Sequence, residues 1–224
     1  MNRASMPLLR AVHAVLAAFV VAGCSSADAV DPGGDEGGAC KTGVNAAWAV
    51  PAGNAFALPS GVVLDGEMTG NIDDDPCVKL LPIEYGGDYL PVCIVIKNTT
   101  GSTVNLKLPA GLTFLAKDPA TMNGILLQEH DLEIPAGEKK PFRFALYSIN
   151  EDCSHGKKTT VFSFGNVTND AGIAELVTLA RGRTMTYKAT ATASVFAAAV
   201  WDITSSRGLG AERRKQIADV RDGD

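Results

Sequence analysis

The feature that most constrains this fold is a series of short apolar runs, separated by turn residues, across residues 61–164. Apolar and polar residues alternate within them, so that Val104, Leu106 and Leu108 fall on one face of an extended chain. Such alternation is typical of strands that bury one face, and the intervening turn residues favour antiparallel pairing. We therefore expect a mainly β fold in which residues 39–168 form an antiparallel sandwich.

Two strand pairs follow from this pattern. Residues 77–85 and 89–97 flank the turn sequence Gly-Gly-Asp at 86–88, which predicts a β-hairpin. Residues 125–134 and 142–149 are expected to form a second pair, because both contain apolar runs and a turn lies between them.

The tripeptide Pro-Ala-Gly occurs at residues 51–53, 109–111 and 135–137, each time after Val, Leu or Ile. Proline fixes φ at the second position of a turn, and glycine suits the fourth. Each copy is therefore expected to close a type I turn.

The periodicity changes from two to 3.6 after Asn169. Asp170 is suited to cap a helix whose apolar residues share one face: Ile173, Leu176, Val177 and Ala180. Residues 190–204 and 211–220 show two further helical patterns. We expect two or three α-helices within residues 169–224, packed on the β body, since a separate domain of about 50 residues would have a small core.

A resemblance to a known family rests on three short sequences. Asn-Thr-Thr at residues 98–100 is followed by Val-Asn-Leu at 104–106 and by Ile-Pro-Ala-Gly at 134–137. This order resembles bacterial immunoglobulin-like modules, in which an Asn-Thr turn precedes one strand and Pro-x-Gly precedes another. The resemblance implies that the expected sandwich is immunoglobulin-like.

The start of the chain is typical of an export signal. Arg3 and Arg10 precede a 13-residue run at 11–23 that is apolar except for His13. A helix that crosses a bilayer core of roughly 30 Å needs about 20 residues. The run therefore indicates a signal peptide instead of a membrane-spanning helix.

The apolar run ends in Val21, Ala22, Gly23 and Cys24. An aliphatic residue and two small ones before a cysteine resemble the lipobox of bacterial lipoproteins. The resemblance implies that a signal peptide of residues 1–23 is removed. It also implies that the thiol of Cys24 takes a diacylglyceryl group and its new amino group a further acyl chain such as palmitate. Each buried CH₂ contributes about 0.8 kcal/mol, so these chains would hold the protein on a membrane.

Residues 24–38 are expected to form a flexible tether after the lipidated cysteine. The segment from Ser25 onward is small, polar and acidic, with four acids and no bases, and such a composition buries little surface. By the same resemblance, Ser25 in place of Asp favours sorting to the outer membrane of a bacterial cell envelope over retention in the inner one. The net charge of −5 argues against a nucleic-acid surface, which needs a basic patch.

Four cysteines remain besides the one in the lipobox: Cys40, Cys77, Cys93 and Cys153. An exported chain meets an oxidising compartment, so we expect two disulfides. The predicted hairpin sets Cys77 and Cys93 out of register, which argues against a bond between them. Two connectivities stay open: Cys40–Cys77 with Cys93–Cys153, or Cys40–Cys93 with Cys77–Cys153.

An acidic sequence at residues 71–76 offers oxygen ligands at alternating positions: Asn71, Asp73 and Asp75. Calcium needs six to eight oxygens on a backbone that can wrap around it. Because Pro76 stands where a calcium loop of the EF-hand type has glycine, we expect a solvated turn here, and no metal or other cofactor.

Two functional hypotheses fit these features. Beyond the signal peptide the chain has only His130 and His155, which suggest no catalytic triad. We favour a non-catalytic, lipid-anchored envelope module that binds a protein or glycan ligand or serves the envelope structurally. The alternative is an envelope enzyme or enzyme inhibitor that uses exposed loops or carboxylates such as Asp73, Asp75 or Glu129. Two carboxyl groups about 5–10 Å apart in a cleft would identify such an enzyme.

Overall fold

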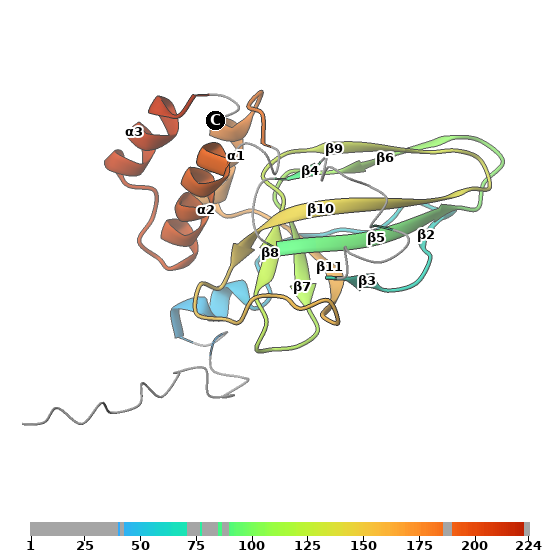
Figure 1. Ribbon diagram of the computed structural model, residues 1–224, viewed down its shortest axis with the longest axis horizontal. Coiled ribbons are helices and arrows are strands. Elements are labelled where there is room, and N and C mark those ends of the chain that lie inside the picture. The colour runs from blue at the N-terminus through green and yellow to red at the C-terminus, as the bar shows by residue number, and fades with distance from the viewer. Residues whose placement is uncertain are drawn as a thin grey trace, which may run out of the picture. The chain divides into compact units, whose positions relative to one another are not determined.

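A computed structural model describes residues 40, 43–70, 77, 85–86, 90–185 and 190–221, which all lie in one compact unit, Asp35–Asp224. The described elements begin with the 3-10 helix η2 (Gly43–Trp48) (Figure 1). The strands are β1 (Gly53–Ala55), β2 (Val62–Leu64), β3 (Met68–Thr69), β4 (Tyr85–Gly86), β5 (Leu90–Asn98), β6 (Val104–Leu108), β7 (Leu112–Ala116), β8 (Asn123–Ile125), β9 (His130–Ile134), β10 (Lys139–Ile149) and β11 (Val161–Thr168). The helices α1 (Ala171–Ala180), α2 (Thr190–Thr204) and α3 (Ala211–Asp219) follow.

Six strands close into a barrel. The pairing runs β5–β3–β11–β7–β8–β10 and returns from β10 to β5, and every one of these pairs is antiparallel. Strands β2 and β1 extend the sheet from β5 and β11, β4 pairs in parallel with β10, and β6 pairs with β9 in a separate sheet. The mainly β fold with three C-terminal helices is confirmed. The main sheet differs from an open sandwich layer, because the long strand β10 pairs with both β5 and β8 and so closes the ring.

The barrel core is a cluster of buried side chains on the inner faces of the strands. Phe114 lies at its centre, with ring centroids 6.3 Å from Phe144 and 5.4 Å from Phe164. Leu106 and Ile134 of the two-stranded sheet belong to the same cluster. The sheet of β6 and β9 therefore packs its apolar face onto the barrel core, which explains the alternation seen in the sequence.

A second cluster, the seam core, joins the outer face of the barrel to the three helices. It takes Ile125 from β8, Tyr147 and Ile149 from β10, and residues of each helix, among them Leu176, Phe196 and Ile217. Strand β10 thus buries side chains on both faces, and Figure 1 shows the helices gathered at one end of the strands. The helices share a core with the barrel instead of enclosing one of their own.

The three helices lie close to their expected bounds. Asp170 caps α1 as predicted, since its Oδ1 accepts a hydrogen bond of 2.9 Å from the backbone N–H of Ile173. Gly182 follows the end of α1 with a φ of 75°, a conformation that glycine adopts without steric cost. Local sequence signals therefore determine where this part of the chain turns helical.

The predicted pairing of residues 125–134 with 142–149 is correct only at its start. Ile125 pairs with Tyr147, but His130–Ile134 pairs with Val104–Leu108 instead. The ladder ends at Ile125, because the next residues turn away from β10 and lead the chain into the two-stranded sheet. The apolar pattern marks both strands but carries no signal for the switch between sheets.

The Pro-Ala-Gly turns are placed one position away from the prediction. The N–H of Leu112 donates to the carbonyl of Pro109, and that of Glu138 donates to Pro135, each at 3.2 Å. Proline is therefore the first residue of the turn, and glycine is the third, with φ of 83° at Gly111. A positive φ at the third position is what requires glycine. The copy at residues 51–53 differs, because its glycine begins β1.

Neither disulfide connectivity left open by the sequence is correct. The bonds are Cys40–Cys153 and Cys77–Cys93, with Cα separations of 4.9 and 5.9 Å. The described part of the expected hairpin does not have the register that argued against Cys77–Cys93, since Tyr85 pairs in parallel with Phe144 of β10; residues 78–84 and 87–89 lie outside the described part of the chain. Thr69, at the end of β3, pairs with Cys93, so the chain leaves β3 at the level of Cys93. Contacts between segments distant in sequence, which local pattern does not encode, set this pairing.

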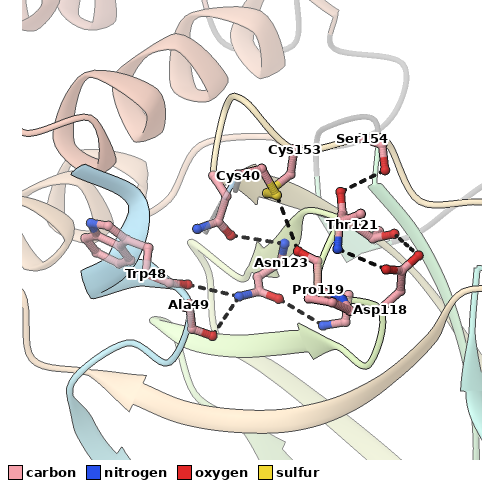
Figure 2. Close-up of a disulfide and its surroundings, with 12 residues drawn as sticks. Cys40, Trp48, Ala49, Asp118, Pro119, Thr121, Asn123, Cys153 and Ser154 are labelled. Carbon is pink, nitrogen blue, oxygen red and sulfur yellow. Dashed lines mark hydrogen bonds between the residues drawn. A yellow bond between two sulfur atoms is a disulfide. The ribbon is translucent and has the colours of Figure 1, made fainter. Parts of the chain in front are cut away.

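The Cys40–Cys153 bond lies beside a buried polar contact that fixes η2 to the barrel (Figure 2). Asn123, fully buried in β8, donates from Nδ2 to the carbonyls of Trp48 and Ala49 at 2.9 and 3.1 Å. Its Oδ1 accepts from the N–H of Ala116 in β7. The start of the described chain is therefore held to the barrel both covalently and by hydrogen bonds.

The segment that resembles immunoglobulin-like modules is organised by Asn98, which is fully buried at the end of β5. Its side-chain amide donates to three carbonyl oxygens, those of Ser102, Ile134 and Pro135. Its Oδ1 accepts from the N–H and the hydroxyl of Thr100. One side chain thus joins the turn after β5 to the end of β9.

Candidate functional site

A pocket of about 780 Å³ lies where the barrel meets the end of α1. Its walls come from the turn before β7, the segment between β8 and β9, and the residues that end and follow α1. The lining consists of Ala110, Leu127, Gln128, Glu129, His130, Val177, Arg181, Gly182, Arg183, Thr184 and Met185. We call it the seam pocket. A pocket of this size, whose lining mixes apolar side chains with polar and charged ones, is a candidate for a binding site.

The carbonyl groups at the end of α1 are satisfied by side chains of the pocket. Gln128 Nε2 donates to the carbonyls of Ala180 and Arg183 at 2.8 and 2.9 Å. Arg183 donates from Nε to the carbonyl of Leu179 and from Nη1 to that of Val220. The exposed carbonyls that give a helix C-terminus its partial negative charge are therefore capped.

His130, the first residue of β9, is largely buried at the pocket wall. Its ring centroid lies 5.9 Å from that of Phe144, at the edge of the barrel core. Burial lowers the pKa of His130 to about 4, although the nearby carboxylates of Asp131 and Glu129 act in the opposite direction. The imidazole is therefore neutral at physiological pH.

Glu129 is the acidic residue of the pocket lining, and Lys107 of β6 balances its charge. Lys107 Nζ lies 2.6 Å from Glu129 and 3.8 Å from Asp131. The hydrogen bond to Glu129 raises the pKa of Lys107, so the ammonium group stays charged. All three side chains are about half exposed or more, so this group belongs to the rim of the pocket.

Most site residues expected from the sequence lie outside the described part of the chain. These are Val21, Ala22, Gly23 and Cys24, which were predicted to form a lipobox, and the candidate cation ligands Asn71, Asp73 and Asp75. Glu129 is placed in the seam pocket. Asp131 lies near Glu129, since Lys107 contacts both carboxylates, but it is not part of the pocket lining.

Two further observations apply to the described residues alone. They contain no group of three or more His, Cys, Asp or Glu side chains that could hold a metal ion. None of their helices is long and apolar enough to cross a bilayer.

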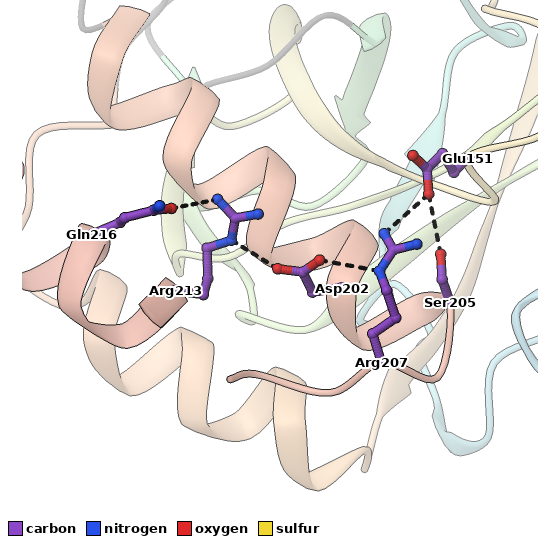
Figure 3. A network of polar contacts seen from close by, with 6 residues as sticks. All are labelled: Glu151, Asp202, Ser205, Arg207, Arg213 and Gln216. Carbon is purple, nitrogen blue, oxygen red and sulfur yellow. Dashed lines mark hydrogen bonds and ion pairs between the residues drawn. The ribbon is translucent and has the colours of Figure 1, made fainter. Parts of the chain in front are cut away.

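A network of ion pairs holds the helical side of the seam together (Figure 3). Asp202 of α2 binds Arg207 at 3.2 Å and Arg213 of α3 at 2.7 Å. Arg207 also contacts Glu151, in the loop after β10, at 3.2 Å. Asp202 is only 20% exposed, so these charges are less screened than a surface pair. The network connects the loop after β10 to α2 and α3, close to where α2 ends and α3 begins.

Gln128, Arg181 and Arg183 belong to no motif that marks them as functional residues in the sequence. The available signal was an Arg-Gly-Arg sequence directly after a predicted helix, where cations interact favourably with the last carbonyls. That signal explains how α1 ends, but only the contact between the end of α1 and the segment that joins β8 to β9 shows that a pocket forms there.

No protein-family model matches this chain, and it shows no significant similarity to a curated protein or a solved structure.

Proposed function

We propose that this protein is a lipid-anchored, non-catalytic module of the bacterial cell envelope that binds a ligand in the seam pocket. The observation that carries the binding role is the pocket itself, about 780 Å³ between a disulfide-bonded barrel and a helical layer. Its lining combines apolar walls with arginine, glutamine and imidazole side chains, the composition expected of a ligand site.

The anchor is supported by the signal sequence that ends in Cys24, and the two disulfides agree with an oxidising compartment outside the cytoplasm. Ser25 supports placement at the outer membrane. The immunoglobulin-like relation of residues 98–137 is part of the proposal too, supported by the way Asn98 joins β5 to the end of β9.

Membrane fractionation tests the anchor. Wild type should sediment with membranes and enter the detergent phase, whereas Cys24→Ser should lose the acyl chains and leave that phase. Ser26→Ala is the matched control, because it changes a residue two positions after Cys24 but leaves Val21 to Cys24 and both disulfides intact. Equal partitioning of wild type and Cys24→Ser would contradict the anchor.

A pocket-filling substitution tests the binding role. Val177, half-buried in α1, lines the pocket, and Val177→Trp should fill part of it. Screening a fragment library by NMR should shift the methyl signals of Leu127, Val177 and Met185 in the wild type. The hits should be lost in Val177→Trp and retained in the control Val63→Trp, a change at an exposed residue of β2 outside the lining. Fragments that bind the wild type and Val177→Trp equally well would contradict the proposal.

The enzyme alternative has less support. Glu129 and Asp131 share Lys107, but of the two only Glu129 lines the pocket, so the pair does not face a common cleft. A carboxylate pair in a cleft was the observation expected of that alternative.

A further inference from the structure

We infer that the seam pocket binds a carboxylate that is joined to an apolar group, such as the end of an acyl chain or the C-terminal residue of a peptide. This inference rests on the proposed function, because it names the chemistry of the ligand at the same site.

Side-chain charge favours an anion. Arg181 and Arg183 contribute two positive charges to the lining, against one negative charge from Glu129. Lys107 holds Glu129 at 2.6 Å, so that negative charge is already paired. His130 is neutral at physiological pH, so the arginines set the sign of the pocket.

The arginines have donors to offer. Arg183 is fixed in place by its Nε and Nη1 bonds to the carbonyls of Leu179 and Val220. Within the described residues, its Nη2 and the whole guanidinium of Arg181 make no hydrogen bond or ion pair. A guanidinium group suits a carboxylate because its N–H groups can bind both oxygens.

The helix end does not oppose an anion as a bare C-terminus would. Gln128 and Arg183 cap the carbonyls of Leu179 and Ala180, and the N–H of Arg181 donates to Thr178. The partial negative charge of the helix is therefore met within the protein, leaving the arginine charges to act on a ligand.

Part of the wall is apolar. Leu127 and Met185 are 2% and 4% exposed and belong to the seam core, and Val177 of α1 packs against that cluster. Val177 and Ala110, which are only partly buried, therefore offer the apolar surface that a group next to the carboxylate can cover, and burial contributes to affinity in proportion to the area.

The test uses the chain from Ser25 to Asp224, exported with an ordinary signal peptide so that neither lipid nor detergent competes for the pocket. Every described contact lies within the compact unit Asp35–Asp224, so this chain keeps the whole folded body. The probes are octanoate and N-acetyl-leucyl-leucine, each compared with a neutral counterpart: octanol and the dipeptide amide. Methyl shifts of Leu127, Val177 and Met185 report binding.

We expect at least one carboxylate to bind about fivefold or more tightly than its neutral counterpart, with an affinity that falls as salt is raised. Arg181→Gln should weaken that binding about 3- to 10-fold, since one charged donor is lost. Glu129→Gln should strengthen it. Lys97→Gln, which removes the same charge from an exposed position on β5 outside the lining, should leave it unchanged.

The outcomes separate the inference from the proposed function. Binding of octanoate alone identifies an acyl chain as the source of the carboxylate, and binding of the dipeptide alone identifies a peptide end. Neutral counterparts that bind as tightly as the carboxylates overturn the inference but leave a binding pocket. Failure of both carboxylates to shift the pocket methyls also overturns it, and the fragment screen with Val177→Trp then decides the proposed function separately.

Discussion

The barrel core and the seam core contain similar numbers of buried apolar residues but are held together differently. The barrel core packs phenylalanine and branched side chains from many strands, and both disulfides cross-link segments on the barrel side. The seam core relies on smaller side chains in α2, such as Ala197 and Ala199, and on the ion pairs around Asp202. The difference indicates a covalently reinforced scaffold and a helical layer that can open more easily, with the pocket at their junction.

Removal of the Cys40–Cys153 bond should have the largest effect. The double variant Cys40→Ala with Cys153→Ala should lower the free energy of unfolding by about 5 kcal/mol, because the bond closes a loop with a sequence separation of 113. The same change at Cys77 and Cys93 should cost about 3 kcal/mol, since that separation is 16. Guanidinium denaturation measures both, and the reverse order would show that loop length does not govern scaffold stability.

Substituting one fully buried phenylalanine in each core compares the two cores directly. Phe144→Ala in the barrel and Phe196→Ala in α2 each remove a side chain that contacts water nowhere, at a cost of about 3–5 kcal/mol where the whole fold depends on it. We expect Phe144→Ala to destabilise the whole unit. Phe196→Ala should instead increase hydrogen exchange mainly in α1–α3.

Amide exchange followed by mass spectrometry distinguishes these results. In Phe196→Ala, strands β5 and β10 should keep the protection of the wild type. Equal loss of protection in β5 and α2 for both variants would mean that the two cores unfold as one.

The buried imidazole at the pocket gives the seam a pH dependence. The pKa of His130 is lowered from 6.5 to about 4, so between these values the folded state binds fewer protons than the unfolded state. Stability attributable to this group therefore falls as pH falls from about 6.5 to 4, by at most about 3 kcal/mol. The charged groups near it are Glu129 and Asp131, beside His130 on the chain, and Lys107, which pairs with both; Arg181 and Arg183 line the same pocket.

His130→Gln tests this dependence, because glutamine does not titrate. The difference in unfolding free energy between wild type and variant should change with pH across that window and stay constant above pH 7. A difference that is flat from pH 7 to 4 would place the histidine in contact with water.

The ion-pair network should have the smallest effect. Asp202→Asn leaves Arg207 and Arg213 with weaker partners and should cost about 1 kcal/mol, with less loss at high salt. Asp219→Asn, which removes an exposed pair with Lys215 within α3, should change stability by less than about 0.5 kcal/mol. Thermal unfolding at two salt concentrations compares them, and equal losses would show that the seam gains nothing from its buried charge.

Features that depend on a few neighbouring residues, such as helix caps and strand alternation, were predicted correctly from the sequence. The cap at Asp170 and the apolar face with Leu176 predicted α1, and the alternation of Leu106 with Leu108 predicted β6. The turn after Pro109 was recognised, but its register was one residue off, because the glycine φ that defines the turn type is not visible in the sequence.

Long-range pairing was not predictable in the same way. The sequence argued against the Cys77–Cys93 bond, because residues 89–97 were expected to pair with residues 77–85. In the structure β5 pairs with β10, and the bond forms. The seam pocket was missed for the same reason, since Gln128 and Arg183 are more than 50 residues apart and meet only when α1 packs on the barrel.

The sequence by itself determined the class of elements and the approximate helix bounds, because periodicity, caps and turn residues act over a few positions. The tertiary structure decided the closure of the barrel through β10, the disulfide partners and the charge of the pocket. These features depend on which segments of the chain pack together. The free energy that favours one packing arrangement over others comes from burying apolar surface contributed by the whole chain.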